Sequence, residues 1–406
     1  MYTFGIYIYI LLVRLAALFG HRKARLKLAG HKQTFAVLNE KLKPGNEYIW
    51  FHVSSRGGFE QSRPMIERLH ATHPEYRVVL TFFSPSGYEL AKSYQQVDAV
   101  CFLPFDTRRN VKRFLDALQP RMAFFMKCEF WLNCLTELKN RNIPVYSISS
   151  VFDNKRSRLG VTGSRLRLAL HCFTHLFVQD ENSKAMLKGI GINNVSVVGN
   201  TRFDRVVKVL EQARQIPLLE TFAQGNRLFV AGCSQRDDEA VYIPFFNRDR
   251  EWKLVIVPCG LDDERIKSIE KQYAGTCVRY TRATMENIHN AGCLIIDTYD
   301  LLSVVYKYAD LALIGGSFGR GVRNVLEAAV YGIPLLIGPE SNRSHEAQSL
   351  LECGGAVKVT DAYDFGEKVN MLYNDKEYSE RIGAVAGEYV MENTGATARI
   401  FREIGL

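Results

Sequence analysis

The segment from Leu313 to Pro339, which reads LIGGSFGRGVRNVLEAAVYGIPLLIGP, contains the pattern that decides the fold. An apolar strand runs into a glycine-rich turn, and a short helical pattern and a second apolar strand follow. Glycines let backbone amides approach a ligand closely, and a helix that starts after them directs its N–H groups at an anion. Glu327 lies about one turn inside that helix, where it can accept hydrogen bonds from ribose hydroxyls. The segment predicts a nucleotide site, although the same glycines would also suit close packing.

Two common phosphate motifs are excluded for this segment. No Gly-Lys-Ser/Thr follows the glycines, so the segment is not a P-loop. It is also not a dinucleotide fingerprint near the start of a domain.

The composition is that of a globular protein with a basic surface. A chain of 406 residues is long enough for two domains, and 47% hydrophobic with 23% charged residues excludes a disordered chain. The net charge of +9 favours an acidic partner, such as an anionic membrane or a phosphorylated substrate. The nine cysteines form no CxxC pair, which argues against a disulfide framework or a zinc site and favours a reducing compartment, the cytoplasm.

Strand and helix patterns alternate along both halves of the chain, which predicts parallel sheets covered on both faces. We expect strands at residues 48–53, 77–83, 99–103, 122–126, 145–148, 175–178 and 195–198, then at 228–231, 254–257, 277–280, 294–297, 311–314, 335–337 and 356–359. In such sheets ligands bind at the carboxyl ends of the strands. We predict a membrane anchor with its basic flank at 1–30, an N-terminal acceptor-binding domain at 31–205, a linker at 206–226 and a C-terminal donor-binding domain with terminal helices at 227–406.

The N-terminal segment has the character of a membrane element. Residues 1–20 are almost wholly apolar or aromatic apart from Arg14, and a basic run follows with Arg22, Lys23, Arg25 and Lys27. No small-residue cleavage site is present, so a secretory signal peptide is not expected. The segment is barely long enough to span a bilayer, so a signal anchor and a helix lying in the membrane interface both remain possible, with a buried soluble helix as the third interpretation. In the first two, the basic run places the protein on the cytoplasmic side, beside anionic lipid.

Four motifs in a fixed order carry a family resemblance. They are the loop 55–64, the segment KCEFWLN at 127–133, the segment GNTRFD at 199–204, and the pair GGS at 315–317 with NVLEAA at 324–329. With the N-terminal anchor they make the chain resemble the transferases of 3-deoxy-D-manno-octulosonic acid (Kdo). The resemblance implies an α/β fold of the GT-B class. That class has two doubly wound, parallel-sheet, Rossmann-like domains facing a central cleft, here with an N-terminal membrane-anchor helix.

The resemblance also implies an activity. It implies an inverting, metal-independent transfer of Kdo from CMP-Kdo to a lipid A precursor, in lipopolysaccharide core biosynthesis at the cytoplasmic face of the inner membrane. The expected partners are CMP-Kdo, the lipid A precursor and an anionic membrane surface. No nucleic-acid partner is expected because no nucleic-acid-binding motif is present. No cofactor is expected beyond the donor substrate CMP-Kdo, and no metal is expected because no paired-Asp motif stands out. Helix amides of the turn at 319–324 would bind the leaving phosphate, with Arg320 and Arg323 adding charge or lying as solvated loop residues.

The resemblance implies site residues as well. The family base position, a glutamate in the family, is occupied here by Gly58. We therefore name Glu60 and Glu129 as catalytic carboxylates and Arg202 as the residue that meets the sugar carboxylate. In an extended loop Glu60 would face the same side as position 58, although a cap or surface role for it is also open. For Glu129 the alternative role is packing at the strand end, and for Arg202 it is a structural pair with Asp204. The donor-binding residues are Pro258, Cys259, Gly315, Gly316, Ser317, Asn324, Val325, Leu326 and Glu327.

A second interpretation belongs to another class of protein. Gly58 and the pair Cys259-Gly260, which replaces a family histidine signature, fit a paralogue that keeps the fold and binds a CMP-sugar or lipid but is catalytically impaired. Arg323 also replaces a histidine that the family commonly has before Asn324.

Overall fold

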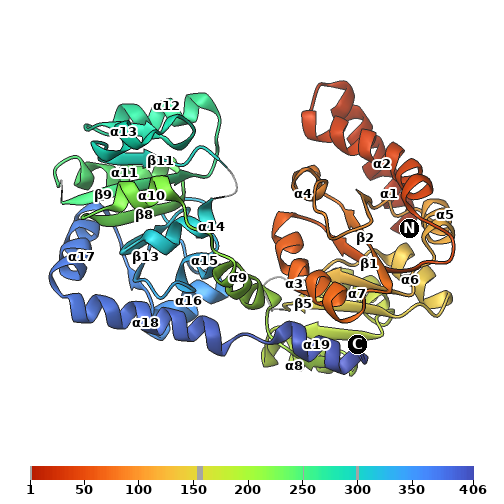
Figure 1. The fold of residues 1–406 in the computed structure, drawn as a ribbon. Helices are drawn as coiled ribbons and strands as arrows, with labels where there is room; N and C mark the ends of the chain where they lie inside the picture. Colours follow the sequence, from red (N-terminus) through yellow and green to blue (C-terminus); the bar gives the residue numbers. More distant parts are fainter. Residues whose placement is uncertain (1, 153–158, 250, 299–300) are drawn as a thin grey trace. The chain divides into compact units, whose positions relative to one another are not determined.

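The computed structural model describes residues 2–152, 159–249, 251–298 and 301–406, and it divides into two compact units (Figure 1). Unit 1 consists of Met1–Arg205 with Thr394–Leu406, and unit 2 consists of Val206–Asn393. Each unit contains a seven-stranded sheet. The described strand pairs are all parallel, which confirms the predicted fold class of two doubly wound α/β units, the architecture of the GT-B fold.

Unit 1 is built from short apolar strands joined by helices. Its strands are β1 (Glu47–Val53), β2 (Tyr76–Phe82), β3 (Ala99–Phe102), β4 (Met122–Met126), β5 (Val145–Ser150), β6 (His175–Val178) and β7 (Val195–Val197). Its helices are α1 (Tyr2–Leu18), α2 (Arg22–Lys41), α3 (Arg56–Thr72), α4 (Pro85–Ala91), α5 (Arg108–Leu118), α6 (Leu132–Asn140), α7 (Leu159–Leu170), α8 (Glu181–Gly189), the first part of α9 (Thr201–Glu211) and α19 (Ala396–Ile404).

Unit 2 repeats the same plan. Its strands are β8 (Arg227–Ser234), β9 (Trp252–Pro258), β10 (Cys277–Arg279), β11 (Cys293–Ile295), β12 (Leu311–Ile314), β13 (Leu335–Ile337) and β14 (Val357–Lys358). Its helices are α10 (Pro217–Ala223), α11 (Arg236–Phe246), α12 (Asp263–Gln272), α13 (Met285–His289), α14 (Leu302–Val305), α15 (Leu326–Ala329), α16 (His345–Glu352), α17 (Ala362–Asn374) and α18 (Lys376–Glu392), with 3-10 turns at Tyr280–Arg282 and Tyr306–Tyr308.

The strand order places one switch point in each sheet. The orders are β3-β2-β1-β4-β5-β6-β7 and β10-β11-β9-β8-β12-β13-β14, so the chain reverses direction between β1 and β4 and between β8 and β12. Central strands such as β4 are buried along their whole length, because helices cover both faces of the sheet. Loops that leave the carboxyl ends at a switch point diverge and leave room for a ligand.

The structure differs from the sequence interpretation at the C-terminal helix. Residues 394–406 were predicted to lie in the C-terminal domain, but α19 packs in unit 1, where Ile400 and Phe401 enter the core cluster of β1, β2 and α3. The Asp204 carboxylate accepts hydrogen bonds from the N–H groups of Gly395 and Thr397 at 2.6 and 2.7 Å and so holds the start of α19. A long-range cap of this kind leaves no periodic signal in the sequence.

Two further boundaries differ. The predicted linker at 206–226 contains the end of α9 and α10, and α10 contributes the buried Leu219 and Phe222 to unit 2. The segment 55–64, which the sequence analysis treats as a loop, is helical from Arg56 onward, with Ser55 as the N-cap of α3.

Candidate functional site

Glu129 lies at the carboxyl edge of the first sheet, in the loop that follows β4. Its Oε2 accepts a hydrogen bond from Trp131 Nε1 at 3.1 Å. The same indole N–H points at His52 Nε2, also at 3.1 Å, so it is shared between the two acceptors. Burial raises the pKa of the Glu129 carboxyl, and hydrogen bonds from Ser54 and Trp131 only partly offset this effect. A half-buried carboxyl with a raised pKa at a switch point is a candidate general base.

His52 supports this carboxylate as a neutral imidazole. It is fully buried in β1, and this burial lowers its pKa to about 3. Because Nε2 accepts from Trp131, the ring proton sits on Nδ1, which lies 2.9 Å from Thr81 Oγ1. Thr81 also accepts from Trp50 Nε1 at 2.8 Å. A continuous hydrogen-bond chain therefore runs from the core of the sheet to Glu129, and His52 has a structural role in it.

The two glycines at the start of α3 face different surroundings. A Cβ on Gly57 would lie 3.8 Å from Lys127 Nζ and 3.9 Å from Arg202 Nη2. A Cβ on Gly58 would instead meet the side chains of Val53 at 3.5 Å and Met126 at 3.9 Å, beneath the helix. Two cations therefore gather above Gly57 at the N-terminus of α3, where the helix dipole also favours an anion. Arg202 and Lys127 therefore lie near each other at this helix end, and the predicted contact of Arg202 with a sugar carboxylate stays a prediction.

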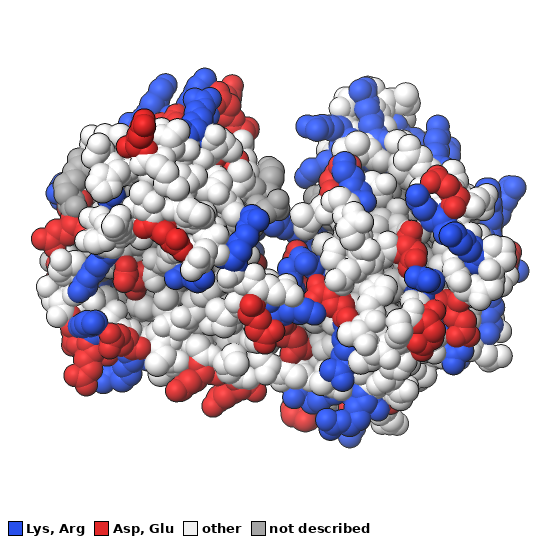
Figure 2. Space-filling model, viewed as in Figure 1, with Lys and Arg blue, Asp and Glu red and all other residues white. Residues whose placement is uncertain are grey.

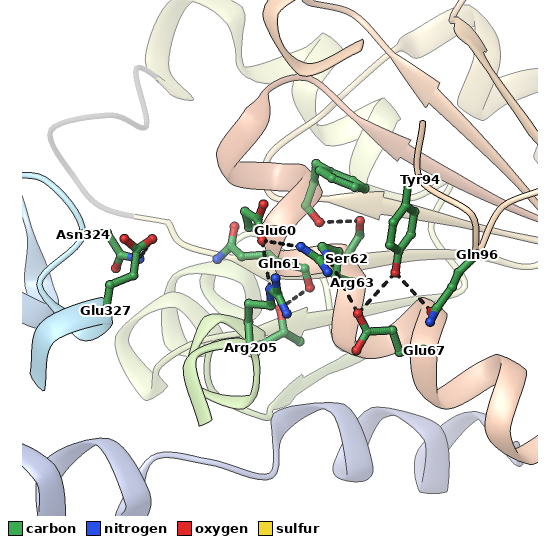
Figure 3. Close-up of polar contacts among 12 residues, drawn as sticks. Glu60, Gln61, Ser62, Arg63, Glu67, Tyr94, Gln96, Arg205, Asn324 and Glu327 are labelled. Atoms are coloured by element: carbon green, nitrogen blue, oxygen red, sulfur yellow. Dashed lines mark hydrogen bonds and ion pairs between the residues drawn. The ribbon is translucent and has the colours of Figure 1, made fainter. Parts of the chain in front are cut away.

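Glu60 is engaged by arginines. Its Oε2 accepts from Arg205 Nε at 2.9 Å and from Arg63 Nη1 at 3.4 Å (Figure 3). The expectation that Glu60 faces the same side as position 58 is wrong, because residues two apart on a helix point in different directions. The ion pairs favour a structural role for Glu60.

The segment 199–204 chiefly ties elements of unit 1 together. Asn200 Oδ1 accepts from the buried Gln61 side chain of α3 at 2.6 Å, and Thr201 Oγ1 donates to the Gln61 carbonyl at 2.8 Å. Asp204 holds α19, as described above. The carboxylate of Asp204 therefore binds backbone N–H groups in place of the predicted pair with Arg202.

In unit 2 the glycine-rich turn is held by a buried carboxylate that the sequence interpretation missed. Asp238, in the first turn of α11, accepts from the N–H groups of Gly316 at 2.7 Å and Phe318 at 3.1 Å. A Cβ on Gly315 would lie 2.3 Å from the Cys233 carbonyl oxygen, and Ser317 Oγ donates to the Ile314 carbonyl. Close packing therefore explains the glycines, as the alternative interpretation proposed.

The expectation that helix amides at 319–324 bind a phosphate is wrong. The N–H groups of Gly319 and Gly321 both donate to the Gly316 carbonyl, that of Val322 to the Glu340 carbonyl and that of Arg323 to the Gly315 carbonyl. The following helix, α15, begins only at Leu326 and has 4 residues. The donors are thus largely used within the turn, which folds back on itself before any helix forms.

Arginine side chains at the neighbouring strand ends offer positive charge instead. A cavity of about 340 Å³ opens at the start of α11, next to the ends of β8 and β9. Arg236 and Arg320 are exposed there, whereas Arg265 forms a buried ion pair with Glu239. The cavity is lined by Ser234, Gln235, Arg236, Asp237, Cys259, Arg265 and Arg320. Of the predicted donor-binding residues Cys259 lies on its wall, and Pro258 is the last residue of β9.

Asn324 and Glu327 form a second polar element of unit 2. Asn324 Nδ2 donates to Glu327 Oε1 at 2.8 Å (Figure 3). The Oδ1 atom of Asn324 is buried and has no hydrogen-bond partner within the protein, so a donor group of a ligand would satisfy it. Val325 and Leu326 are buried beneath this pair and anchor it.

Strained backbone marks the same edges. Lys127 at the end of β4, Ser149 in β5 and Cys233 in β8 have φ values of 62°, 53° and 54°, a region that residues other than glycine rarely adopt. Such strain concentrates at functional sites, where the surrounding fold enforces it.

Helix α1 presents an apolar surface. Among its large exposed side chains are Phe4, Leu11, Leu12 and Leu18, with 56% to 77% of their surface accessible. Figure 2 shows Lys and Arg side chains around the α1–α2 pair. Lys27 is not among the exposed ones, contrary to expectation: its ammonium lies 3.1 Å from the Phe83 ring centroid and donates to Tyr9 Oη at 2.7 Å. Among the residues that the structure describes, no helix combines the length and apolar character needed to cross a bilayer.

Comparisons with known proteins agree with this architecture. Residues 23–205 match the family model described as 3-deoxy-D-manno-octulosonic-acid transferase. This part of the chain is therefore similar to the Kdo transferases. A 3-deoxy-D-manno-octulosonic acid transferase of Haemophilus influenzae is 26% identical, over 88% of this chain and 86% of that protein.

Solved structures show the same fold at lower identity. UDP-GlcNAc 2-epimerase of Neisseria meningitidis superposes with a TM-score of 0.64 at 17% identity, over 88% of this chain and 99% of the epimerase. MurG of Acinetobacter baumannii gives a TM-score of 0.53 at 12% identity, over 88% of this chain and 99% of that protein.

In this Kdo transferase relative, sequence reasoning missed several residues that shape the two edges. Asp238 had a usable signal, because Gln235 and Asp238 form a capping box directly after β8. The contacts of His52 with Trp131 and of Lys127 with the start of α3 join separate strands, so only the fold reveals them.

The depressed pKa of His52 predicts an acid-sensitive stability that depends on this residue. In the unfolded chain His52 takes up a proton below its ordinary pKa of 6.5, whereas in the folded protein it does so only near pH 3. The free energy of unfolding is therefore highest above pH 6.5 and decreases as the pH falls towards 3. His52→Gln can accept from Trp131 and donate to Thr81 without titrating. Urea unfolding between pH 7 and 4.5 should show a smaller loss for the variant, by about 1.4 kcal/mol per pH unit.

The control for this measurement is Trp131→Phe, which breaks the same contact but leaves His52 in place. Its pH slope should match that of the wild type. Equal slopes for His52→Gln and the wild type would contradict the assignment.

Proposed function

We propose that this protein transfers Kdo from CMP-Kdo to a lipid A precursor in lipopolysaccharide core biosynthesis, with inversion and without a metal ion. The family match of the N-terminal half and the GT-B architecture support a Kdo glycosyltransferase. The observation that carries the proposal is the polar edge of unit 1, where Glu129 lies in the same loop as Lys127, and Arg202 and Lys127 face the start of α3.

Glu129 is the proposed general base. An acceptor hydroxyl must lose a proton as it attacks the anomeric carbon of the donor, and a carboxylate with a raised pKa suits that task. The shared Trp131 N–H and the neutral His52 fix its orientation. Arg202 and Lys127 would bind the carboxylate of the sugar acid by charge.

The leaving CMP would be stabilised by arginines of unit 2. Arg236 and Arg320 at the cavity match a phosphate in charge, and Arg323 adds to them. Glu327 would accept from the ribose hydroxyls and Asn324 Oδ1 from another donor group of the nucleotide. This arrangement supplies the positive charge from side chains, and the nucleotide sugar serves as the substrate with no further cofactor.

A second candidate function is favoured by one specific observation. Position 58 carries no side chain, and Glu60 is engaged by Arg63 and Arg205. If Glu129 does not act as a base, the protein would bind a CMP-sugar or lipid without transferring sugar.

The α1 helix supports a location at the cytoplasmic face of the inner membrane. Its exposed apolar side chains would lie in the headgroup region, and the exposed Arg22, Lys23 and Arg25 would meet anionic lipid. An acceptor held in the bilayer would then reach the enzyme without leaving the membrane.

Purified protein with CMP-Kdo and a lipid A precursor should form a glycosylated product, measured by mass spectrometry of the lipid. A chelator should leave the rate unchanged, because arginines neutralise the leaving phosphate. No product above background, together with CMP binding by calorimetry, would establish the non-catalytic alternative.

Glu129→Gln should lower kcat by about 10²- to 10⁴-fold, because the amide cannot take the proton. The wild-type rate should fall as the pH drops through the raised pKa of Glu129, and this acid limb should be absent from the residual activity of the variant. Glu60→Gln is the matched control and should keep both most of the rate and the limb. Similar losses in the two variants would contradict the assignment.

The double variant Leu11→Asp with Leu12→Asp should bind vesicles containing phosphatidylglycerol more weakly than the wild type, because two charges would enter the headgroup region. Leu168→Asp changes an equally exposed leucine, 58% accessible, on α7 and should float with the vesicles as the wild type does. Equal flotation of all three proteins would exclude α1 as the membrane contact.

A further inference from the structure

Two cysteines lie at the carboxyl edge of the second sheet, and the proposed transfer assigns no chemical step to either thiol. Cys233 lies in β8 and Cys259 directly follows β9, the strand that pairs with β8. The pairing is irregular at this point, since Gly232 pairs with Val257 and Ser234 with Pro258, so that Cys233 is the extra residue. The Cys259 N–H donates to the Ser234 carbonyl at 2.9 Å.

The irregular pairing brings the two thiols together. Cys233 directly precedes Ser234, and Cys259 directly follows Pro258, the residue that pairs with Ser234, so the two cysteines lie diagonally across two adjacent strands. The thiols form a side-chain hydrogen bond with each other. Both cysteines are unbridged, Cys259 is exposed and Cys233 is half-buried.

The two sulfurs differ in their electrostatic surroundings. The hydrogen bond from Cys233 lowers the pKa of the Cys259 thiol, and the Arg323 guanidinium lowers it further, although partial burial opposes them. The same hydrogen bond, with burial, raises the pKa of Cys233. Cys259 is thus the thiolate and Cys233 the thiol that donates to it. Oriented with its oxygen towards Arg323, the Gln235 amide accepts from Nη2 and Nε at 3.0 and 3.2 Å and holds the guanidinium in place.

We propose that Cys233 and Cys259 form a redox-active dithiol in the wall of the arginine-lined cavity, which a low-molecular-weight disulfide such as oxidised glutathione converts to an intramolecular disulfide. The inference does not depend on the transferase activity, because it concerns only these two thiols and their neighbours.

The reaction proceeds in two balanced steps. The Cys259 thiolate attacks one sulfur of the reagent, which forms a mixed disulfide and releases one thiolate. Cys233 then loses its proton and attacks the Cys259 sulfur, which forms the Cys233–Cys259 bond and releases the second thiolate. The released thiolates take up protons from Cys233 and from solvent. Two protein thiols are oxidised and one reagent disulfide is reduced to two thiols.

Oxidation changes the cavity. Cys259 is one of its lining residues, and the disulfide removes the thiolate that faces Arg323. The positive charge of Arg323 is then no longer offset at the wall.

The test uses the reduced full-length protein, oxidised glutathione at pH 7, an alkylating quench and tryptic mass spectrometry. Trypsin releases Cys233 in the peptide 228–236 and Cys259 in the peptide 254–265, and each contains a single cysteine. The expected product is the disulfide-linked pair of these peptides. Its absence, with glutathione on either peptide or on neither, would overturn the proposal.

Variants assign the roles. Cys233→Ser should lose the linked pair and accumulate glutathione on peptide 254–265, because no resolving thiol remains. Cys259→Ser should lose both products. Arg323→Gln should slow the first step, because the guanidinium stabilises the thiolate. Cys353→Ser changes another exposed cysteine of unit 2 and should form the linked pair at the wild-type rate. Glutathione addition to Cys259 no faster than to Cys353 in the wild-type sample would overturn the assigned roles.

Discussion

Parallel strand pairing at the two switch points is the constraint on which the rest of the structure depends. The register of β1 with β4 and of β8 with β12 places the carboxyl ends of these strands at one edge of each sheet. The residues with chemistry lie at or next to those ends. In unit 1, Lys127 and Glu129 follow β4. In unit 2, Cys233 lies near the end of β8, the glycine turn follows β12, and Cys259 follows the neighbouring β9. The strained φ values of Lys127 and Cys233 lie at the same edges, which indicates that the sheets hold these loops in conformations that the residues would not adopt alone.

Environment, rather than residue type, separates the two candidate carboxylates of unit 1. Glu60 accepts hydrogen bonds from the guanidinium groups of Arg63 and Arg205, so its charge holds α3 against α9. Glu129 lies beside an indole and an uncharged imidazole, and burial favours its protonated form. The same chemical group thus serves cohesion at one position and, in the proposed transfer, proton transfer at the other. The proposal that Glu129 is the base makes the absence of a side chain at Gly58 compatible with catalysis.

In unit 2, arginine side chains supply the positive charge that the sequence analysis had assigned to backbone amides of the glycine turn. The backbone N–H groups of the glycine turn donate hydrogen bonds to Asp238 and to carbonyl groups of the turn itself, so they make the turn rigid. Positive charge comes from arginines at the start of α11 and in the turn. How far the charge of Arg323 is offset depends on its neighbours, because Cys259 and Gln235 both contact its guanidinium. The proposed phosphate site and the proposed dithiol therefore lie next to each other, because Cys259 lines the cavity with Arg236 and Arg320.

The sequence by itself determined the secondary structure, the two-sheet architecture and the family, because apolar periodicity and motif order are local properties. It placed strands at all 14 observed positions, within a few residues at each end. Only the tertiary structure decided that α19 returns to unit 1, that α3 starts at Arg56 and turns Glu60 away from position 58, and that Asp238 occupies the glycine turn. These outcomes depend on contacts between residues far apart in the chain, such as Asp204 with Gly395, whose energy no window of sequence contains.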